Sequence, residues 1–529
     1  MEGIEPQQED PRRITSLHFQ FNGLGWLRDR RNHLFMVEVP EVFGEPAVTP
    51  KGRAAASADP ESLKNLGFTE PRRLTDGDAD VMQPCFTADG SAVLVTTTRT
   101  EGAESLVRDL LQVPVDGSPI VRLTDGSVAV HVPVVAGAGT WLVGIERGAS
   151  GVDFVAAHPG LYRLTEAGPG LVTHPEVLIA AAPVAAGESV LAIAEHRGAS
   201  QLLRADADGT ELLLDSTAGV ILVGCGSTPD GPGAAAPIVV TYRTGAGMDE
   251  VGLVENGAVR RLTDFSARLR SATTIREPRE LTTTAPDGYP VHGWVVLPDG
   301  AGPHPTLLLI HGGPFAAYAP AFFDEAQVYA EAGYAVVMCN PRGSSGYGSE
   351  HGRAIQGDFG NLDAADVLAF LDHAVATVPG LDGDRVGIMG GSYGGYLTAW
   401  IIAQDHRWAG AIVERGYLDP ASSVGASDIG WYFPQHYHGS KEQMDAQSPM
   451  LLTDRVTTPT FVIHSEQDLR CPLSQALRYY AQLKLGGIEA ELLVFPGENH
   501  ELSRSGTPWH RRQRFEAILG WWARQLPVG

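Results

Sequence analysis

Short apolar runs separated by Gly, Asp and Pro fill the chain from its start to about residue 275. Runs such as 91–98, 140–145 and 236–243 have the length of β-strands, are rich in β-branched residues and have turn-forming residues on both sides. Long helical patterns are scarce in this part of the chain. The pattern therefore predicts an all-β domain over residues 1–275.

A fragment of four residues, Arg-Leu-Thr followed by Asp or Glu, recurs in this region. It begins at residues 73, 122, 163 and 261, and a weaker copy around 212 makes the steps 49, 41, 49 and 49 residues. A period of 40–50 residues in an all-β region is typical of a β-propeller, because a four-stranded sheet buries both faces only by stacking against similar neighbours. Five or six blades fit in this length, and a pair of β-sandwiches is the alternative.

After Pro278 the pattern changes, and near-continuous apolar strands alternate with helical stretches. Strands of this kind indicate a sheet that is buried on both faces, so residues 276–529 are predicted to form a doubly wound α/β domain. The predicted strands are 292–298, 305–312, 334–340, 384–390, 409–415, 459–465 and 490–496, and the predicted helices include 362–377, 393–404, 473–485 and 508–525.

The strongest local motif is GGSYGG at 390–395, which lies between a predicted strand and a predicted helix. A strand–Ser–helix turn strains the backbone of Ser392, and Gly390 and Gly394 let the neighbouring chain pass closely. The turn projects the hydroxyl above the sheet edge, and the N-terminus of the following helix favours negative charge that develops there. Ser392 is therefore predicted to be a nucleophile, and a chance serine in a glycine-rich turn is the alternative.

A serine nucleophile needs a base, and the base needs an orienting carboxylate. In α/β-hydrolases these residues follow in the order Ser, Asp or Glu, His, each directly after a later strand. Asp468 and His500 each follow a predicted strand, at the carboxyl edge of the sheet where active sites of open α/β folds lie. They are the predicted partners of Ser392, with Glu466 and Asp454 as alternative carboxylates.

The negative charge of a tetrahedral intermediate requires hydrogen-bond donors. The backbone N–H of Tyr393, the residue after the nucleophile, is one predicted donor. The second is predicted in the loop HGGP at 311–314, where glycines let a main-chain N–H approach the substrate. A purely structural turn is the alternative for this loop.

These motifs resemble the prolyl oligopeptidase family of serine peptidases, and most closely its acylaminoacyl-peptidase-like branch. The resemblance implies the catalytic triad Ser392, Asp468 and His500, and a propeller that caps the hydrolase and admits only short or unfolded peptides. The first half of the chain agrees with the family in architecture only. The motifs that carry the resemblance lie at 311–314, 340–348, 390–395, 464–472 and 499–502.

The resemblance also implies that Arg470, two residues after the predicted Asp, binds a carbonyl or carboxylate of the substrate. Read from the residues alone, Arg470 could instead be a surface arginine that pairs with Glu466. The aromatic segment 431–433 lies where α/β-hydrolases insert pocket elements. We predict that Trp431, Tyr432 or Phe433 lines an apolar pocket beside the nucleophile, with ordinary core packing as the alternative.

Three features depart from the family pattern. Position 311 holds His where prolyl oligopeptidases use a Tyr hydroxyl, so the N–H of Gly313 is the expected second donor, as in the acylaminoacyl branch. The sequence has no Glu-Glu pair of the kind that four-type dipeptidyl peptidases use to bind a substrate amino terminus, which disfavours that activity. Family members usually carry seven or eight blades, so an incomplete propeller is expected.

Charge and composition limit the classes of binding partner that we expect for this protein. The 529 residues include 39 Lys and Arg against 63 Asp and Glu, and the formal charge of −24 repels nucleic acid and anionic membranes, so neither is an expected partner. No apolar run reaches the ~18 residues of a membrane helix, and the acidic start lacks a signal core, so a cytoplasmic location is expected. The four cysteines lack paired metal-ligand spacing, and we expect no metal or cofactor.

The sequence thus predicts a two-domain serine hydrolase that cleaves amide bonds of short or acylated peptides through an acyl-enzyme on Ser392. One rival function is an esterase or amide hydrolase that acts on a small non-peptide metabolite with the same triad. A second rival is a non-enzymatic propeller scaffold with an inactive hydrolase fold. The sequence leaves open whether the chain forms a homo-oligomer.

Overall fold

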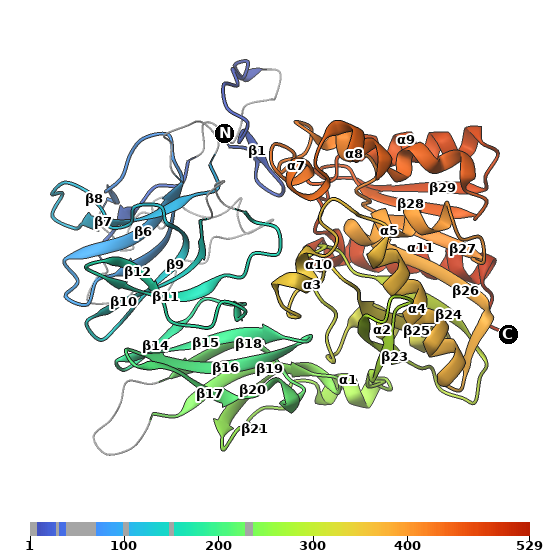
Figure 1. Ribbon diagram of the computed structural model, residues 1–529, viewed down its shortest axis with the longest axis horizontal. Helices are drawn as coiled ribbons and strands as arrows, with labels where there is room; N and C mark the ends of the chain where they lie inside the picture. The colour runs from blue at the N-terminus through green and yellow to red at the C-terminus, as the bar shows by residue number, and fades with distance from the viewer. Residues whose placement is uncertain (1–7, 28–30, 39–69, 99–104, 148–152, 228–235) are drawn as a thin grey trace, which may run out of the picture.

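The computed structural model describes residues 8–27, 31–38, 70–98, 105–147, 153–227 and 236–529. A β-rich N-terminal half and a C-terminal α/β half lie side by side (Figure 1). This arrangement is the predicted one, with propeller-like sheets first and an α/β-hydrolase sheet second. The predicted boundary near residue 275 falls between helix α1 (Ala267–Ala272) and strand β22 (Arg279–Thr284).

Four antiparallel sheets of four or five strands follow one another along the N-terminal half, and two small pairs precede them. The described residues show these four full blades, and the predicted number of five or six stays a prediction for the whole chain. The bounds are β1 (Gln20–Phe21) with β2 (Gly25–Trp26); β3 (Phe35–Met36) with β4 (Arg72–Arg73); β5 (Val81–Phe86), β6 (Ala92–Thr98), β7 (Arg108–Pro114) and β8 (Val121–Arg122); β9 (Val128–Ala136), β10 (Gly139–Glu146), β11 (Gly160–Thr165) and β12 (Gly168–Leu171); β13 (Leu178–Ile179), β14 (Val184–Ala186), β15 (Ser189–His196), β16 (Ala199–Asp206) and β17 (Gly209–Leu214); and β18 (Ile221–Ser227), β19 (Ile238–Thr244), β20 (Gly247–Glu255) and β21 (Ala258–Arg261).

Apolar clusters hold each sheet against the next. Leu94 and Leu110 of the first full sheet pack with Val130 of the second. Trp141 of the second sheet packs with Val190 of the third, and further clusters join the third sheet to the fourth and the β3–β4 pair to the first. Each sheet therefore buries the face of its neighbour, which is the source of stability in a stacked repeat.

A threonine that follows the outer strand marks the repeat. Its hydroxyl accepts a backbone N–H from a residue in, or next to, the neighbouring strand of the same sheet. The copy of the tetrapeptide at 163–166 is an exception, because it overlaps β11, an inner strand, and the hydroxyl of that blade comes from Thr173 instead. The predicted repeat is therefore misaligned by eight residues in this blade, from Thr165 to Thr173, and the step from Thr124 to Thr173 is again 49 residues. The acceptor–donor pairs are Thr75 with Leu34, Thr124 with Leu110, Thr173 with Leu161 and Thr263 with Val251.

An eight-stranded sheet forms the centre of the C-terminal half, in the order β22-β23-β25-β24-β26-β27-β28-β29. The pairs β22–β23 and β23–β25 are antiparallel and the other pairs are parallel. All seven predicted strands are present, and the edge strand β22 is an addition whose polar sequence RELTTT hid it. The remaining bounds are β23 (Pro290–Val296), β24 (His304–Ile310), β25 (Ala335–Asn340), β26 (Leu381–Gly391), β27 (Gly410–Glu414), β28 (Thr460–Ser465) and β29 (Ala490–Phe495).

Helices cover both faces of this sheet. Helices α4 (Leu362–Thr377), α5 (Tyr393–Ile402) and α9 (Leu473–Leu485) pack on one face, and α2 (Asp324–Glu331) and α11 (Pro508–Gln525) pack on the other. None of the helices in the described ranges is long and apolar enough to cross a bilayer. The shorter helices are α3 (Ser349–Arg353), α6 (Pro420–Ser423), α7 (Phe433–His438), α8 (Lys441–Ala446) and α10 (Leu502–Ser505), with 3-10 turns η3 (Ser216–Ala218) and η4 (Pro449–Arg455).

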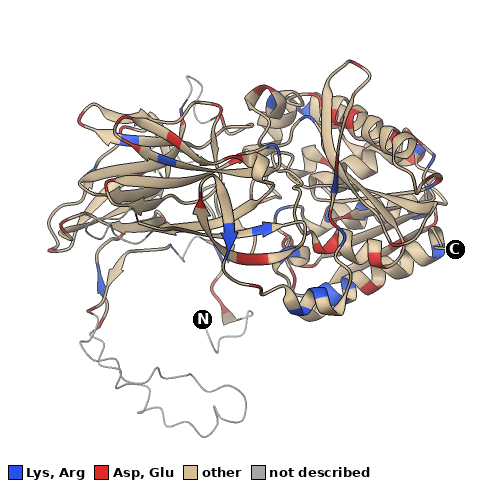
Figure 2. Cartoon of the chain, turned by 90° about the horizontal axis from the view of Figure 1, so that it is seen from below, with Lys and Arg blue, Asp and Glu red and all other residues tan. Residues whose placement is uncertain are grey.

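Polar contacts join the two halves beside α3. The hydroxyl of Ser345 donates to Glu195 at 2.7 Å, and Arg353 pairs with Asp153 at 2.7 Å. Acidic and basic residues are interspersed over both halves in the view of Figure 2. The halves therefore meet through specific pairs at the edge of the sheet where the predicted active-site loops lie.

Candidate active site

Ser392 lies at the sharp turn between β26 and α5. Its backbone has φ 62° and ψ −119°, a conformation that is strained for a residue with a side chain. A Cβ on Gly390 would lie 2.5 Å from the carbonyl of Gly394, and a Cβ on Gly394 would lie 2.1 Å from the oxygen of Ile310. The glycines on either side of Ser392 are therefore required for the turn that presents its hydroxyl at the sheet edge.

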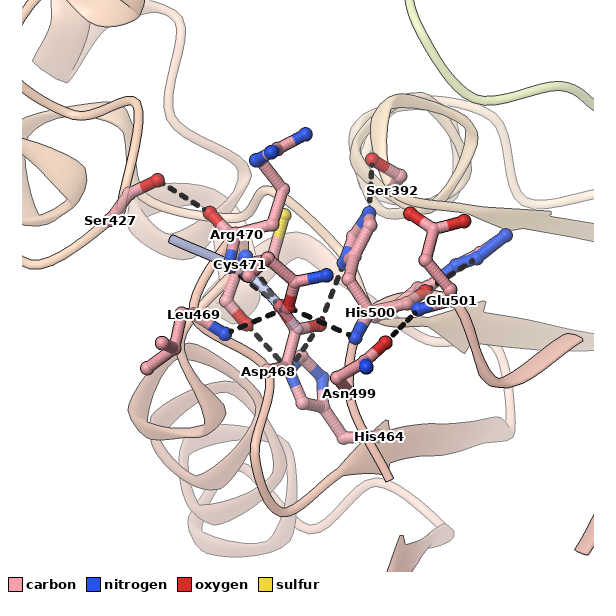
Figure 3. Close-up of polar contacts among 12 residues, drawn as sticks. Ser392, Ser427, His464, Asp468, Leu469, Arg470, Cys471, Asn499, His500 and Glu501 are labelled. Carbon is pink, nitrogen blue, oxygen red and sulfur yellow. Dashed lines mark hydrogen bonds and ion pairs between the residues drawn. The ribbon is translucent and has the colours of Figure 1, made fainter. Parts of the chain in front are cut away.

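His500 lies between Ser392 and Asp468 (Figure 3). Its Nε2 is 3.0 Å from Oγ of Ser392, and its Nδ1 is 2.7 Å from Oδ2 of Asp468. A carboxylate only accepts, so Nδ1 carries the proton and Nε2 is free to accept the hydroxyl proton of Ser392. The structure thus brings together the three residues that chain order singled out.

The alternative carboxylates lie elsewhere. Glu466 accepts the backbone N–H of Gly497 at 3.0 Å, and Asp454 is an exposed residue of η4. Asp468 is held in place by its own loop, because its Oδ1 accepts the N–H groups of Arg470 and Cys471 at 2.9 and 2.8 Å. These hydrogen bonds within the loop therefore hold Asp468, and not Glu466 or Asp454, against the imidazole.

Burial sets the protonation states of the pair. It lowers the pKa of His500 well below 6.5, and the positive charges of Arg415 and Arg470 lower that pKa further. Burial also raises the pKa of Asp468 to about 6. At neutral pH the imidazole is therefore neutral and the carboxyl is ionised, which is the combination a general base requires.

The predicted oxyanion donors lie on the same side of the nucleophile. Gly313, Ser392 and Tyr393 line one pocket, and a Cβ on Gly312 would lie 3.4 Å from the Cβ of Ser392. Tyr393 is the first residue of α5, so its backbone N–H has no partner within the helix. Its phenol donates to the buried carboxylate of Asp363, which anchors this first turn. Donation to an oxyanion by the two N–H groups stays a prediction.

A small apolar pocket of about 140 Å³ opens beside Ser392. Phe433 lies in its wall, together with Phe359, Tyr417 and Ile429, which the sequence pattern did not single out. These side chains come from three separate segments of the chain, around residues 359, 417 and 429–433, so no local motif connects them all.

Trp431 and Tyr432 are not in the wall of this pocket. Tyr432 packs edge-on against Phe154 of the N-terminal half, with 5.0 Å between ring centroids, and Trp431 packs against Tyr432 at 4.6 Å. The three rings diverge because helix α7 begins at Phe433, so the residues before it follow a different backbone path. The two residues therefore support the contact between the halves.

Arg470 lines the pocket but does not pair with Glu466. Its Nε and Nη2 donate to the two oxygens of the buried Asp428 at 2.7 and 3.0 Å. This bidentate pair leaves the third nitrogen, Nη1, outside the contact with Asp428. The fork is thus fixed in direction beside Ser392, and binding of a substrate by Arg470 stays a prediction.

A hairpin from the N-terminal half completes the site, and the sequence analysis did not find its role. The side-chain oxygen of Asn22, at the tip of β1–β2, accepts the N–H groups of Leu469 and His500, each at 3.3 Å. The N–H of Asn22 donates to Asp428 at 2.9 Å, and the hairpin lies beside α7 in Figure 1. The Asn-Gly dipeptide signals a hairpin, but nothing local shows where such a turn docks.

No group of three or more His, Cys, Asp or Glu side chains in the described part of the chain is arranged to hold a metal ion. The remaining histidine nearby, His464, is buried in β28. Its Nε2 lies 2.7 Å from the carbonyl of Cys471 and 3.4 Å from Asp468. Its contacts are those of a structural residue that supports the Asp loop.

Residues 320–528 match the sequence model described as the prolyl oligopeptidase family. The C-terminal half resembles the prolyl oligopeptidase family. The matched segment contains Ser392, Asp468 and His500, so the family resemblance and the observed geometry concern the same residues. The predicted resemblance is confirmed.

Two curated relatives match part of the chain. An uncharacterized peptidase of Bacillus subtilis (strain 168), YuxL, is 39% identical over 275 residues, which are 50% of this chain and 42% of that protein. The acylamino-acid-releasing enzyme of Arabidopsis thaliana is 33% identical over 220 residues, which are 39% of this chain and 28% of the plant protein. The chain therefore matches less than half the length of these relatives.

A solved structure matches both halves. The acylaminoacyl peptidase of Pyrococcus horikoshii superposes with a TM-score of 0.75, covering 88% of this chain and 73% of that chain at 23% identity. At this identity the likeness concerns the fold. It confirms the predicted fold class of a β-rich propeller-like domain followed by an α/β-hydrolase domain.

Proposed function

We propose that this protein is a serine peptidase that hydrolyses amide bonds of short or acylated peptides through an acyl-enzyme on Ser392. The observation that carries the proposal is the relay of hydrogen bonds from Ser392 through His500 to Asp468, with contacts of 3.0 and 2.7 Å. A relay of this geometry activates a serine hydroxyl, and a scaffold protein has no need of it.

The reaction follows from the contacts. Nε2 of His500 removes the proton of Ser392 as Oγ attacks the substrate carbonyl, and Asp468 stabilises the imidazolium that forms. The N–H groups of Tyr393 and Gly313 stabilise the oxyanion of the tetrahedral intermediate. His500 then gives its proton to the leaving amine, and a water molecule repeats the sequence on the acyl-enzyme to release the acid and free the serine.

The proposed substrates are short because the site lies between the two halves. The matched relatives are named a peptidase and an acylamino-acid-releasing enzyme, which supports a peptide or acylated peptide as the substrate class. The pocket of about 140 Å³ suits one apolar side chain next to the cleaved bond. A cytoplasmic location and the oligomeric state stay predictions.

Labelling with a fluorophosphonate probe tests the nucleophile. We expect the probe to modify the native protein and Ser271→Ala, an exposed serine of α1, but not Ser392→Ala. Equal labelling of Ser392→Ala would contradict the proposal.

A substrate panel then separates the amide hydrolase from its rival. Acetylated and free peptide p-nitroanilides are compared with p-nitrophenyl esters and with small non-peptide amides. We expect the acylated peptide to have the highest kcat/KM. An enzyme that turns over only the esters or the non-peptide amides would instead be the metabolite hydrolase.

A further inference from the structure

A second and larger cavity of about 550 Å³ also opens on Ser392. His500 lies in its wall, whereas the 140 Å³ pocket has Tyr393 but not His500 in its wall, and Gly313, Ser392 and Arg470 line both spaces. Ile221 and Arg243 of the N-terminal half also line the larger cavity. The nucleophile therefore lies where two adjoining spaces meet.

The two spaces correspond to the two parts of a cleaved substrate. His500 must deliver its proton to the nitrogen that departs, so the leaving amine lies on the His500 side of Ser392. The acyl part lies on the other side, beside the predicted oxyanion donors. The larger cavity is thus the space for the leaving group, provided that the proposed peptidase function holds.

The wall of the larger cavity is rich in arginine, although the protein carries a formal charge of −24. Most of these arginines are already paired with carboxylates of the protein. Arg514 pairs with Glu414 and Glu325, Arg504 with Glu501, Arg243 with Asp249, and Arg470 with Asp428.

Arg415 is the exception in this wall. It is 7% exposed, and its Nε is buried without a hydrogen-bond partner. Among the described residues, its side chain makes one long hydrogen bond, from Nη1 to the carbonyl oxygen of His500 at 3.5 Å, and it forms no ion pair with a described carboxylate. A cation next to the catalytic histidine therefore has no directly paired carboxylate among the described residues, and the charges of Asp468, Glu414 and Glu501 act on it only from a longer distance.

A buried guanidinium without a directly bonded carboxylate is costly, because it has lost water without gaining an equivalent hydrogen-bond partner for every donor. Its planar fork matches a carboxylate with two parallel hydrogen bonds, and the unused Nε is one of the donors that such a pair requires. The backbone also aims the side chain, since Arg415 has φ 38° directly after β27 and its N–H is bonded to Ile463 at 2.7 Å. The larger cavity thus has in its wall a buried guanidinium with an unused donor.

We propose that Arg415 binds the free C-terminal carboxylate of the leaving amino acid or short peptide. This inference rests on the proposed function and narrows its substrate class to short peptides with an unblocked C-terminus. The bond cleaved then lies near the end of the substrate, and a longer or amidated leaving group lacks the charge that Arg415 requires.

The test compares substrates that differ only at the C-terminus. Three acetylated tripeptides are compared. The first has a free C-terminal carboxylate, the second has a C-terminal amide, and the third has a C-terminal amide and a Glu side chain in the leaving group. For the wild type we expect kcat/KM about ten- to a hundredfold higher for the free carboxylate than for the plain amide. In Arg415→Gln the ratio falls to near one, and Arg415→Lys restores part of it because the charge remains but the fork is lost.

Arg243→Gln is the matched control, because Arg243 lines the same cavity but is paired with Asp249. This variant keeps the preference for the free carboxylate. A wild type that cleaves carboxylate and amide equally, or a preference that Arg243→Gln removes as fully as Arg415→Gln does, would overturn the role of Arg415. Faster cleavage of the Glu-containing amide than of the free carboxylate would also overturn it, in favour of an acidic side chain.

Binding gives a readout that does not depend on turnover. In Ser392→Ala we expect the free carboxylate tripeptide to raise Tm more than its amide, and the difference to vanish when Arg415→Gln is added. Equal shifts for both peptides in Ser392→Ala would contradict this inference alone. A wild type that fluorophosphonate does not label and that turns over no substrate would contradict the proposed function instead. Failure of the role of Arg415 can therefore be distinguished from failure of the peptidase function.

Discussion

The two halves of the molecule contribute to the site in different ways. Ser392, Asp468 and His500 all come from the C-terminal half, on loops that follow strands of one sheet. The side chain that bridges the Asp and His loops, Asn22, comes from the N-terminal half. The catalytic side chains thus all belong to one half. The Asp loop and the His loop are nevertheless bridged by a residue that lies more than 440 residues away from Leu469 in sequence.

This difference predicts that changes in the C-terminal half abolish turnover and changes in the hairpin only weaken it. The variants below test that contrast, in decreasing order of expected effect.

Asp468→Asn has the largest expected effect. An Asn amide would donate to Nδ1 of His500 and force the imidazole proton onto Nε2, so His500 could no longer accept from Ser392. We expect kcat to fall by about 10⁴-fold with little change in fold. The measurement is kcat with near-UV circular dichroism as the structural control, and a loss below tenfold would contradict the assigned carboxylate.

Acid pH comes next. The base must be neutral, so activity present at neutral pH is lost as the pH falls through the pKa of His500, which burial and two arginines place below 6.5. Asp468 must also stay ionised, and burial raises its pKa to about 6, so we expect log kcat/KM to be flat near pH 7, to begin to fall near pH 6 and to fall further as His500 becomes protonated. An acid limb centred above 6.5 would contradict the buried, neutral imidazole.

Asn22→Ala tests the contribution of the N-terminal half. The variant leaves the N–H groups of Leu469 and His500 without their acceptor, and we expect kcat/KM to fall about tenfold. Asn22→Asp keeps an acceptor and restores part of the rate, while its negative charge moves the acid limb to higher pH. The control Gln20→Ala removes only the contact to Ala426. An unshifted pH profile in Asn22→Asp would mean that Asn22 does not act on His500.

The smallest effect concerns the apolar pocket. Phe433→Ala enlarges the pocket beside Ser392, and we expect the kcat/KM ratio between substrates with small and aromatic acyl-side residues to change by about threefold to tenfold. Trp431→Ala, outside this pocket, lowers Tm without changing the ratio. Equal changes of the ratio in both variants would contradict the placement of the two rings.

The strongest predictions from sequence concerned features that are local. Helices α4, α9 and α11 have the predicted bounds, because apolar periodicity and flanking turn residues define them within one segment. Ser392, Asp468 and His500 could be proposed because each follows a strand that the pattern shows clearly. The strained turn at Ser392 follows from the glycines that surround it.

Features that depend on docking between distant segments could not be predicted. Asn22 reads as an ordinary hairpin turn, and Arg415 reads as one of many arginines until its lack of a partner is seen. Trp431 and Tyr432 look like pocket residues, but the approach of Phe154 from the other half draws them into the contact between halves. The tetrapeptide at 163 was assigned to the wrong position in the repeat, because its residues fit an inner strand as well as the turn after an outer strand.

The hairpin at the start of the chain also has a consequence for how the protein is made. Asn22 precedes its partner His500 by 478 residues, so at ribosomal speeds of 5–20 residues per second the two are synthesised about 25 to 95 s apart. During that interval Asn22 has emerged while the loop that carries the base has not yet been translated. The amide-cleaving machinery therefore stays unassembled on the growing polypeptide until the loop that carries His500 has been translated.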